Sequence, residues 1–487
     1  MKKQYIAFLL ALLTAGSCIT ACGGDSSDTQ DPAQTETTTE TTAETEDNTP
    51  KLNLPATDYG GQTFTVLATV HAAYEYDAPE LTGEIVSDAV FHRNIAVEEQ
   101  LGIDLEFIFQ PGHWADKDSF NATIKNSVMA SDAAHDLVSG TMVCVIPVAA
   151  EGIFLNALEL EHIQFDNPWW VQGQKEHFAV NNKLFGFVGD ASLSLYKDMN
   201  VIFFNQKLIT DYSLEDPYTL VLDGTWTIDK LIEMSSSVSN DLDGNGKLEL
   251  GTDLIGYYGH GVPHRGLQTA LEYQIIEYDA QDMPSIVPLR DQDASLFFKL
   301  LDFTALDNVI LKDITDHQEF AIPFTSDLTL FMCEFVYATE YMRDMESDYG
   351  IVPQPKRDEA QEEYHTQVGT STSTFFIPIT ATDAAMTSMT CEALCYYSWL
   401  DVVPAYYEIA LKEKYARNTA MQEMLNIIRD SANVNFAFAY STMFNPFINT
   451  LLPGGHNAKD IASYYAANMK SWEATLESLI TAYEKIE

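Results

Sequence analysis

Basic residues are scarce in this sequence of 487 residues. It has 26 Lys and Arg against 72 Asp and Glu, which gives a formal net charge of −46. Binding to nucleic acid needs a basic surface, so we expect no nucleic-acid partner. The same charge argues against electrostatic docking on anionic lipid, and it favours a neutral or cationic ligand over a small anion.

Apolar runs long enough to cross a bilayer are also missing. The run at residues 5–13 is shorter than the ~20 residues that a membrane helix needs. Because Lys2 and Lys3 precede it and small residues follow, it predicts a secretory signal at residues 1–21. Ile19-Thr20-Ala21-Cys22 resembles the bacterial lipobox and predicts diacylglycerol on the thiol of Cys22. The alternative is an ordinary signal peptide with a chance cysteine.

Residues 25–50 lack Lys and Arg and contain eight acids and nine Thr. Such a segment buries too little apolar area to offset its chain entropy, and its like charges extend it. We therefore predict that residues 22–57 form a lipidated tether. Removal of Lys2 and Lys3 with the signal takes the charge to −48, and the segment accounts for −8, which leaves −40 on the body from Lys51 onward.

Cysteine is rare, with six residues in the chain. An exported protein permits disulfides, but the spacing shows no paired framework. Two of the cysteines stand four residues apart in a predicted helix, where a disulfide fits poorly and partner ligands for zinc are missing. Buried free thiols are therefore predicted at Cys144, Cys333, Cys391 and Cys395.

The body alternates strand-like and helix-like segments. A β-rich run at residues 64–68 precedes helical spacing at 86–101, and an alternating run at 103–107 precedes a second helical stretch at 120–129. This order predicts an α/β lobe with parallel strands. Further along, residues 328–345 carry apolar side chains mostly at helical spacing, which predicts a helix.

The order of motifs in the body resembles the family 1 extracellular solute-binding proteins, the carbohydrate-type receptors of ABC importers. The resemblance covers residues 60–487, and the order and spacing of the motifs carry it. They are the segments Gly83 to Asn94, Pro168-Trp169-Trp170, Lys183 to Gly186, Asn200 to Asn205, Gly224 to Leu231 and Tyr349 to Lys356.

The resemblance implies an α/β, two-lobed periplasmic-binding-protein-like fold of the class II type. A ligand cleft would lie between lobes that are joined by crossing hinge segments, and the lobes would close around the solute. The corresponding boundaries place residues 58–195 and 349–400 in lobe 1, and residues 196–348 and 401–487 in lobe 2.

The resemblance also implies a function. The chain would be a lipid-anchored receptor on the extracellular face of the cell membrane, capturing a carbohydrate, in particular an oligosaccharide, for ABC permease subunits. We expect a monomer that touches the membrane only through its lipid. Two alternatives stay open: a secreted glycoside hydrolase, and a surface polysaccharide-binding protein without a transporter.

Neutral sugars are bound by aromatic faces and planar polar groups, in concave sites with few polar side chains. Aromatic and polar residues in loops or at segment ends are therefore the candidates for ligand binding. They are Tyr74, Tyr76, Trp114, Trp169, Trp170, Asp190, Tyr257, Tyr258, Thr370, Ser371 and Thr372. For each aromatic residue, packing in a core is the competing interpretation.

One segment matches the template of a calcium-binding loop. Oxygen ligands stand at positions 1, 3 and 5, glycine at 6, a backbone carbonyl at 7 and an acid at 9, whereas the bidentate acid is displaced by one residue. We predict a structural Ca²⁺ site there, and a solvated turn is the alternative. The predicted ligands are Asp241, Asp243, Asn245, Lys247, Glu249 and Asp253.

Sequence motifs for catalysis are missing. Nucleophile, zinc-protease and phosphate-loop patterns do not occur in suitable context, and the eleven His show no metal-ligand spacing. Abundant acids would always supply a glycosidase-like carboxylate pair, so such a pair has no weight without geometry. The prediction is therefore a binding protein and not an enzyme.

Overall fold

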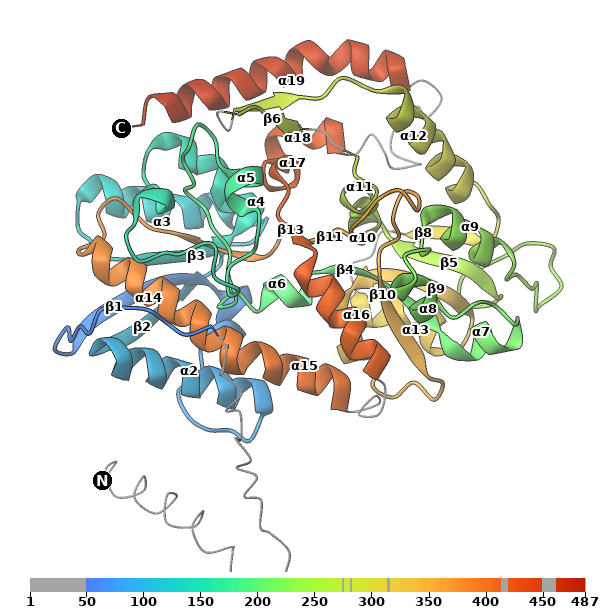
Figure 1. Ribbon diagram of the computed structural model, residues 1–487, viewed down its shortest axis with the longest axis horizontal. Helices are drawn as coiled ribbons and strands as arrows, with labels where there is room; N and C mark the ends of the chain where they lie inside the picture. Colours follow the sequence, from blue (N-terminus) through green and yellow to red (C-terminus); the bar gives the residue numbers. More distant parts are fainter. Residues whose placement is uncertain are drawn as a thin grey trace, which may run out of the picture. The chain divides into compact units, whose positions relative to one another are not determined.

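The first lobe is built on a four-stranded sheet in the order β12-β3-β1-β2 (Figure 1). The computed structural model describes residues 50–273, 276–280, 283–312, 316–412, 419–448 and 461–486. β1 pairs in parallel with β2 and β3, and β12 is antiparallel to β3. The elements are β1 (Gln62–Thr69), β2 (Ile103–Gln110), β3 (Leu137–Thr141), β12 (Ser373–Phe376), α2 (Ile85–Leu101), α3 (Lys117–Ala130) and α14 (Ala384–Tyr397).

The second lobe repeats this topology in a five-stranded sheet, β10-β4-β9-β5-β8. β5 is parallel to β8 and β9. On the other side of β9 lies β4, which is antiparallel to it and comes from the first lobe. In the same way, β12 of the first sheet comes from the second lobe. The strands are β4 (Asn200–Asn205), β5 (Ile255–His260), β8 (Val309–Lys312), β9 (Thr329–Phe335) and β10 (Tyr349–Pro353). The helices are α7 (Gln206–Asp211), α8 (Pro217–Leu222), α9 (Ile228–Ser236), α10 (Gly261–Arg265), α11 (Leu267–Ala270), α12 (Asp291–Thr304) and α13 (His317–Thr325).

The helix predicted over residues 328–345 is wrong, because residues 329–335 form the strand β9. All seven residues of Thr329–Phe335 are buried, and the strand lies between β4 and β5. A central strand that is buried on both faces has a continuous apolar run without alternation, so its sequence can be mistaken for a helix. Only the 3₁₀ helix η5 (Val336–Tyr341) follows.

Among the described residues, the connections between the lobes include three short segments. The first contains α6 (Ser194–Lys197) and leads into β4, and the second follows β10 and contains β11 (Thr366–Gln367). The third is formed by α15 (Val403–Lys412) and α16 (Thr419–Asp430). The first two lie side by side, because Met199 bridges to Val368 and the N–H of Gly369 donates to the Asp198 carbonyl at 2.9 Å.

One predicted lobe boundary is wrong by a strand. β10 pairs antiparallel with β4 from Tyr349–Asn205 to Pro353–Val201, so residues 349–353 belong to the second sheet and not to lobe 1. The chain leaves the second lobe only after Pro353. The proline ends the strand because it offers no N–H to a further ladder bond.

The Gly224 to Leu231 motif has a structural explanation. Thr227 is the N-cap of α9, and its hydroxyl accepts a hydrogen bond from the Lys230 N–H at 3.3 Å. The indole of Trp226 is fully buried against Phe331 and donates to the Pro353 carbonyl at 2.8 Å. The motif therefore fixes α9 to the point where the second crossing segment begins.

The long helix α19 (Ile461–Glu484) contacts both lobes (Figure 1). Near its start, the Tyr465 hydroxyl is hydrogen-bonded to Tyr273 of the second lobe. Near its end, the Tyr483 hydroxyl bonds to Tyr440, and its ring lies 5.1 Å from that of Phe185 in the first lobe. Its buried face carries Tyr465, Trp472, Leu476, Leu479 and Tyr483.

The remaining short elements surround these units. They are α4 (Met142–Val145), α5 (Gln174–Phe178), α17 (Phe436–Ala439), α18 (Ser441–Ile448), β6 (Ile276–Tyr278), β7 (Pro284–Ile286) and β13 (Ala432–Asn433), which pairs with β11. Four cysteines are free and buried, as predicted: Cys144, Cys333, Cys391 and Cys395.

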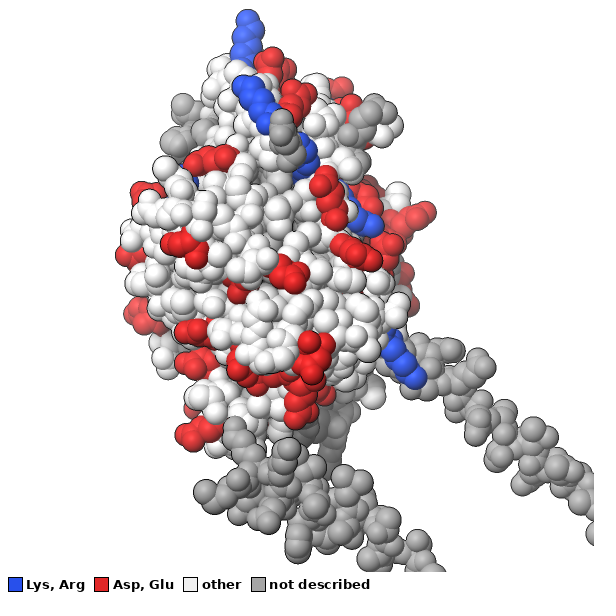
Figure 2. Space-filling model, turned by 90° about the vertical axis from the view of Figure 1, so that its left-hand side faces the viewer, with Lys and Arg blue, Asp and Glu red and all other residues white. Residues whose placement is uncertain are grey.

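On the face of the molecule in Figure 2, acidic side chains are scattered over a mostly uncharged surface, and Lys and Arg are fewer. In the part of the chain that the structure describes, no helix is both long enough and apolar enough to cross a bilayer. The predicted signal, the lipidation site Cys22 and the tether up to residue 49 lie outside the described residues.

Candidate functional site

The carboxyl ends of the parallel strands bring loop residues of the first lobe together. In such sheets, ligands bind beyond the carboxyl ends of the strands. β1 ends at Thr69 and leads into a 3₁₀ helix that carries Tyr74, which is 40% exposed. The Lys197 ammonium lies 4.5 Å from the centre of the Tyr74 ring, so the first crossing segment touches this edge of the first lobe.

A histidine pair stands beside Tyr74. The rings of His71 and His113 are 4.9 Å apart, and His113 Nε2 lies 3.3 Å from Ser371 Oγ on the second crossing segment. Burial lowers the pKa of His113, and the neighbouring His71 lowers it further. Trp114 follows directly and is 47% exposed. Of the candidate residues, Ser371 thus contacts this pair, and Tyr74 and Trp114 lie within three residues of it along the chain.

The second lobe contributes aromatic side chains at its own strand ends. β9 ends at Phe335, and η5 then carries Tyr337 and Tyr341, whose rings are 6.1 Å apart. Tyr341 is 40% exposed. The carboxylate of Glu340, between them, pairs with the Lys197 ammonium at 2.9 Å. Lys197 therefore links the aromatic edges of both lobes.

Asp198 adds an acid at the same place. Burial raises the pKa of Asp198 to about 7, and the nearby Glu75 carboxylate adds to this effect. Together these residues define the strand-end region, which comprises His71, Tyr74, His113, Trp114, Lys197, Asp198, Tyr337, Tyr341 and Ser371. It offers exposed aromatic faces with a few polar groups between them, the combination that suits a neutral polyhydroxyl ligand.

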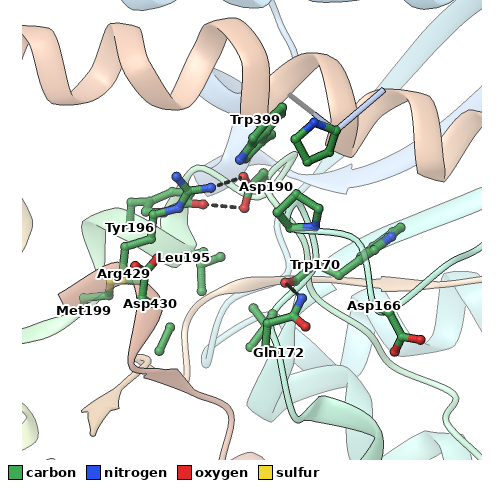
Figure 3. A pocket seen from close by; sticks show the side chains of 14 residues that line it. Asp166, Trp170, Gln172, Asp190, Leu195, Tyr196, Met199, Trp399, Arg429 and Asp430 are labelled. Atoms are coloured by element: carbon green, nitrogen blue, oxygen red, sulfur yellow. Dashed lines mark hydrogen bonds and ion pairs between the residues drawn. The ribbon is translucent and has the colours of Figure 1, made fainter. Parts of the chain in front are cut away.

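A pocket of about 420 Å³ opens on another part of the crossing segments (Figure 3). We call it the hinge pocket, and its lining includes Trp170, Asp190, Tyr196, Met199, Trp399 and Arg429. Arg429 Nη2 donates to Asp190 Oδ2 at 3.1 Å, and the Tyr196 hydroxyl donates to Asp190 Oδ1 (Figure 3). Burial raises the pKa of Asp190 to about 7, against the opposing effect of Arg429. The three polar groups satisfy one another, which favours a structural role.

Trp169 and Trp170 belong to a buried network. Both indole N–H groups donate to the carboxylate of Glu392 on α14, at 2.9 Å and 2.8 Å. Asn167 Nδ2 donates to the same carboxylate at 2.7 Å. The Pro168-Trp169-Trp170 motif therefore holds a loop on α14, and Trp170 meets the hinge pocket with little exposed surface.

Three further aromatic candidates lie in the cores. Tyr76 is fully buried, with its hydroxyl 2.8 Å from Ser139 Oγ. The Tyr257 hydroxyl lies 3.0 Å from His264 Nδ1, and the ring of Tyr258 stacks on Phe320 at 4.0 Å. In this arrangement these side chains present almost no surface to a solute, so packing explains their positions.

The three polar candidates on the second crossing segment differ in how exposed they are. Ser371 is exposed, Thr370 is half-buried and Thr372 is buried. The carbonyls of Thr370 and Thr372 accept the first N–H groups of the segment that begins at Met142, at 3.2 Å and 3.0 Å. Their backbone therefore ties the crossing segment to the end of β3, and Ser371 is the one whose hydroxyl reaches the strand-end region.

The predicted calcium loop brings three carboxylates together. One ligand oxygen from each of Asp241, Asp243 and Asp253 lies within 4.8 Å of the others. Asp253 is fully buried and accepts the N–H groups of Leu242 and Glu249, both at 2.8 Å. Hydrogen bonds from backbone N–H groups, first that of Gly246, lower the pKa of Asp241.

The other predicted ligands of this loop have different roles. Asn245 Oδ1 accepts the Lys247 N–H at 2.8 Å, and Glu249 is exposed. The fold therefore forms a tight loop around three acids, and binding of Ca²⁺ stays a prediction.

Sequence analysis missed several residues that define these sites. Lys197, Asp198, His113 and Glu392 carry no motif of their own. The first three have a positional signal in the sequence, because each lies within a few residues of the end or the start of a strand: His113 after β2, and Lys197 and Asp198 before β4. No comparable signal marks Glu392, since a buried acid in a helix is recognised only when its hydrogen-bond donors are known.

Comparison with known proteins supports the architecture. No protein-family model matches the chain, and no curated protein sequence matches it. Among solved structures, the chain is similar to a cyclo/maltodextrin-binding protein complexed with maltotetraose, with 11% identity and a TM-score of 0.51, over 88% of this chain and 98% of that one.

Two other solved structures agree. One is an ABC transporter solute-binding protein from Thermotoga lettingae TMO bound with α-D-tagatose (12% identity, TM-score 0.51, 86% of this chain and 100% of that one). The other is a Streptococcus pneumoniae solute-binding protein in complex with the blood group A-trisaccharide (14% identity, TM-score 0.50, 84% and 100%). The chain therefore has the two-lobed α/β fold of periplasmic-binding-protein-like solute-binding proteins, as the sequence predicts.

Proposed function

We propose that this chain is an extracellular receptor that captures a carbohydrate between its two lobes and delivers it to the permease of an ABC importer. The observation that carries the proposal is the set of exposed aromatic rings at the strand ends, Tyr74 and Trp114 on the first lobe and Tyr341 on the second. The similar solved structures hold maltotetraose, α-D-tagatose and a blood group trisaccharide, which supports a sugar as the ligand.

The chemistry of the strand-end region favours a neutral sugar. Pyranose rings present C–H faces that pack on aromatic side chains, and their hydroxyls need both donors and acceptors. Trp114 and Tyr341 supply faces, and Lys197, Asp198 and Ser371 supply polar groups of both kinds. A strongly acidic body repels anions, so an anionic solute would need several basic groups at its site. Among the residues that define the strand-end region, Lys197 is the one Lys or Arg.

Closure of the lobes provides the capture step. The crossing segments lie side by side at Met199 and Val368, and small changes of backbone angle there would bring the two strand-end surfaces together. The receptor performs no chemistry in this proposal. It acts as a monomer, held at the outer face of the membrane through lipid on Cys22, and the loop at residues 241–253 binds Ca²⁺ as a structural ion.

A thermal-shift screen tests the choice of ligand. The mature chain is heated with neutral oligosaccharides, with short peptides and with amines at matched concentrations. A ligand present at 100 times its Kd stabilises the native state by about 2.7 kcal/mol, so a true solute raises the Tm clearly. We expect a shift with a subset of oligosaccharides, whereas a shift with peptides or amines alone would reject the sugar.

A further inference from the structure

Two histidines and one glutamate meet at the carboxyl edge of the second sheet. His260 is the last residue of β5, Glu334 stands one residue before the end of β9, and His317 is the first residue of α13. These residues are far apart in the sequence, and the parallel arrangement of β5 and β9 brings them together. One ligand atom from each lies within 4.8 Å of the others.

The distances within this cluster do not fit hydrogen bonds. Glu334 Oε2 lies 3.5 Å from His260 Nδ1 and 3.6 Å from His317 Nδ1. None of these three atoms has a hydrogen-bond partner, although all three are buried. Ligands of a tetrahedral ion with bonds of ~2.0–2.1 Å lie about 3.3–3.5 Å apart, so these two distances are within about 0.1 Å of the spacing around a shared ion. Buried polar atoms without partners call for such an explanation.

The surroundings orient the carboxylate of Glu334. The side chain is 1% exposed, and one of its oxygens, Oε1, accepts the Phe335 N–H at 2.9 Å. This hydrogen bond leaves the other oxygen, Oε2, directed toward the two histidines.

Aromatic rings surround the imidazoles and limit how they can turn. The His260 ring lies 5.8 Å from that of Phe320, and the His317 ring lies 5.0 Å from that of Tyr337 in an edge-to-face contact. His317 keeps 29% of its side chain exposed, so an ion has a route from solvent.

We propose that His260, His317 and Glu334 form a binding site for a divalent transition-metal ion of the zinc class. Imidazole and carboxylate ligands suit Zn²⁺ and its neighbours, whereas Ca²⁺ and Mg²⁺ prefer sites built from oxygen alone. Three protein ligands leave at least one coordination position for water or for a group of a bound solute. The proposal does not rest on the sugar function, because it is argued from the geometry of these three side chains alone, although His317 contacts Tyr337 of the strand-end region.

Calorimetric titration of the full mature chain tests the site. The protein is treated with a chelator, dialysed and titrated with Zn²⁺, and in parallel Co²⁺ is added to record its visible absorption. We expect one Zn²⁺ per chain and a Co²⁺ spectrum typical of nitrogen and oxygen ligands. Glu334→Gln and His317→Ala should each weaken Zn²⁺ affinity about 100-fold or more. Loss of a residue that only hydrogen-bonds to a metal ligand lowers metal affinity about 10–100-fold, and loss of the ligand itself should cost at least as much.

Two controls keep the test decisive. Asp241→Asn alters the cluster of Asp241, Asp243 and Asp253, the second group of possible metal ligands among the described residues, and should leave Zn²⁺ binding unchanged. His317→Ala changes a half-exposed side chain at a helix start, so its fold can be checked by circular dichroism in the presence of chelator. The proposal fails if the wild-type chain binds no Zn²⁺, or if folded H317A and E334Q bind it as tightly as the wild type.

Discussion

The guanidinium of Arg429 at the end of α16 lies 3.1 Å from the buried carboxylate of Asp190, which precedes the first crossing segment. This ion pair joins the third connection between the lobes to the first. Tyr196 on α6 completes it with a hydroxyl donated to the same carboxylate. Sequence analysis assigned Asp190 to ligand binding, whereas this network gives it a role in holding the connecting segments together.

Arg429→Met should therefore destabilise the chain by about 3 kcal/mol, because it removes a buried hydrogen-bonded charge partner and leaves Asp190 buried either charged and unpaired or protonated. Urea unfolding at neutral pH measures the change. Lys230→Met is the matched control: Lys230 bonds to the exposed Glu215 at 2.7 Å, and loss of such a surface pair costs about 0–1 kcal/mol. Equal losses in the two variants would contradict the assignment.

Stability should fall as the pH rises from about 4 to about 7. Burial and the nearby Glu75 raise the pKa of Asp198 to about 7, whereas the unfolded chain has an Asp pKa of about 3.9. Within this window the native state keeps a proton that the unfolded state has lost, so raising the pH favours unfolding by up to about 1.4 kcal/mol per pH unit for this group.

Asp198→Asn separates this contribution from that of Asp190, whose pKa burial also raises to about 7. The amide carries no titrating proton, so the variant should lose less stability than the wild type between pH 4.5 and 7.5. Urea unfolding at four pH values gives both curves. Parallel curves would show that Asp198 titrates normally in the native state.

Glu392 is expected to be essential for the Trp169-Trp170 loop. The two indoles and the Asn167 amide donate to both oxygens of the Glu392 carboxylate. Gln at this position has one acceptor oxygen, and its NH₂ group would point at one of these N–H donors. Each buried donor without a partner costs about 1–3 kcal/mol, so Glu392→Gln should destabilise by about 2 kcal/mol or more. Thermal unfolding measures the loss, and intrinsic Trp fluorescence should change with it. An unchanged Tm would mean that the loop does not depend on these hydrogen bonds.

Calcium should raise the Tm of the wild-type chain, and a chelator should lower it. Asp241, Asp243 and Asp253 already lie close together, so binding needs little rearrangement and relieves the repulsion among them. Asp243→Asn should weaken the response, because it removes an exposed ligand charge without touching the buried Asp253. A wild-type Tm that is the same in Ca²⁺ and in chelator would reject the calcium site.

The alternation of short strands and helices predicts much of the first lobe, because the edge strand β2 stays partly exposed and α2 buries one face, with Val90, Val97 and Leu101. It fails at β9, where burial on both faces removes the alternation that identifies a strand. The lobe boundary at Tyr349 failed for a similar reason. A strand's partner is set by tertiary pairing, and residues 349–353 look the same in either sheet.

The site could be predicted only in part. Trp114 and Ser371, which lie in the strand-end region, could be chosen because loop aromatics and polar runs are visible in sequence, and their contact with a ligand stays a prediction. Tyr257 and Tyr258 were chosen by the same criterion, but they lie in β5 and are buried, because the surrounding glycines belong to a strand and not to a loop. The His260–His317–Glu334 cluster shows no spacing in sequence, since three separate elements bring it together.

The most direct measurement is calorimetric titration of an oligosaccharide from the thermal-shift screen into the wild-type chain, Trp114→Ala and Trp399→Ala. Trp114 presents an exposed ring in the strand-end region, whereas Trp399 lines the hinge pocket. Loss of one stacking ring should weaken binding about tenfold or more. We predict this loss for Trp114→Ala and wild-type affinity for Trp399→Ala; full affinity in Trp114→Ala with loss in Trp399→Ala would contradict capture between the strand ends.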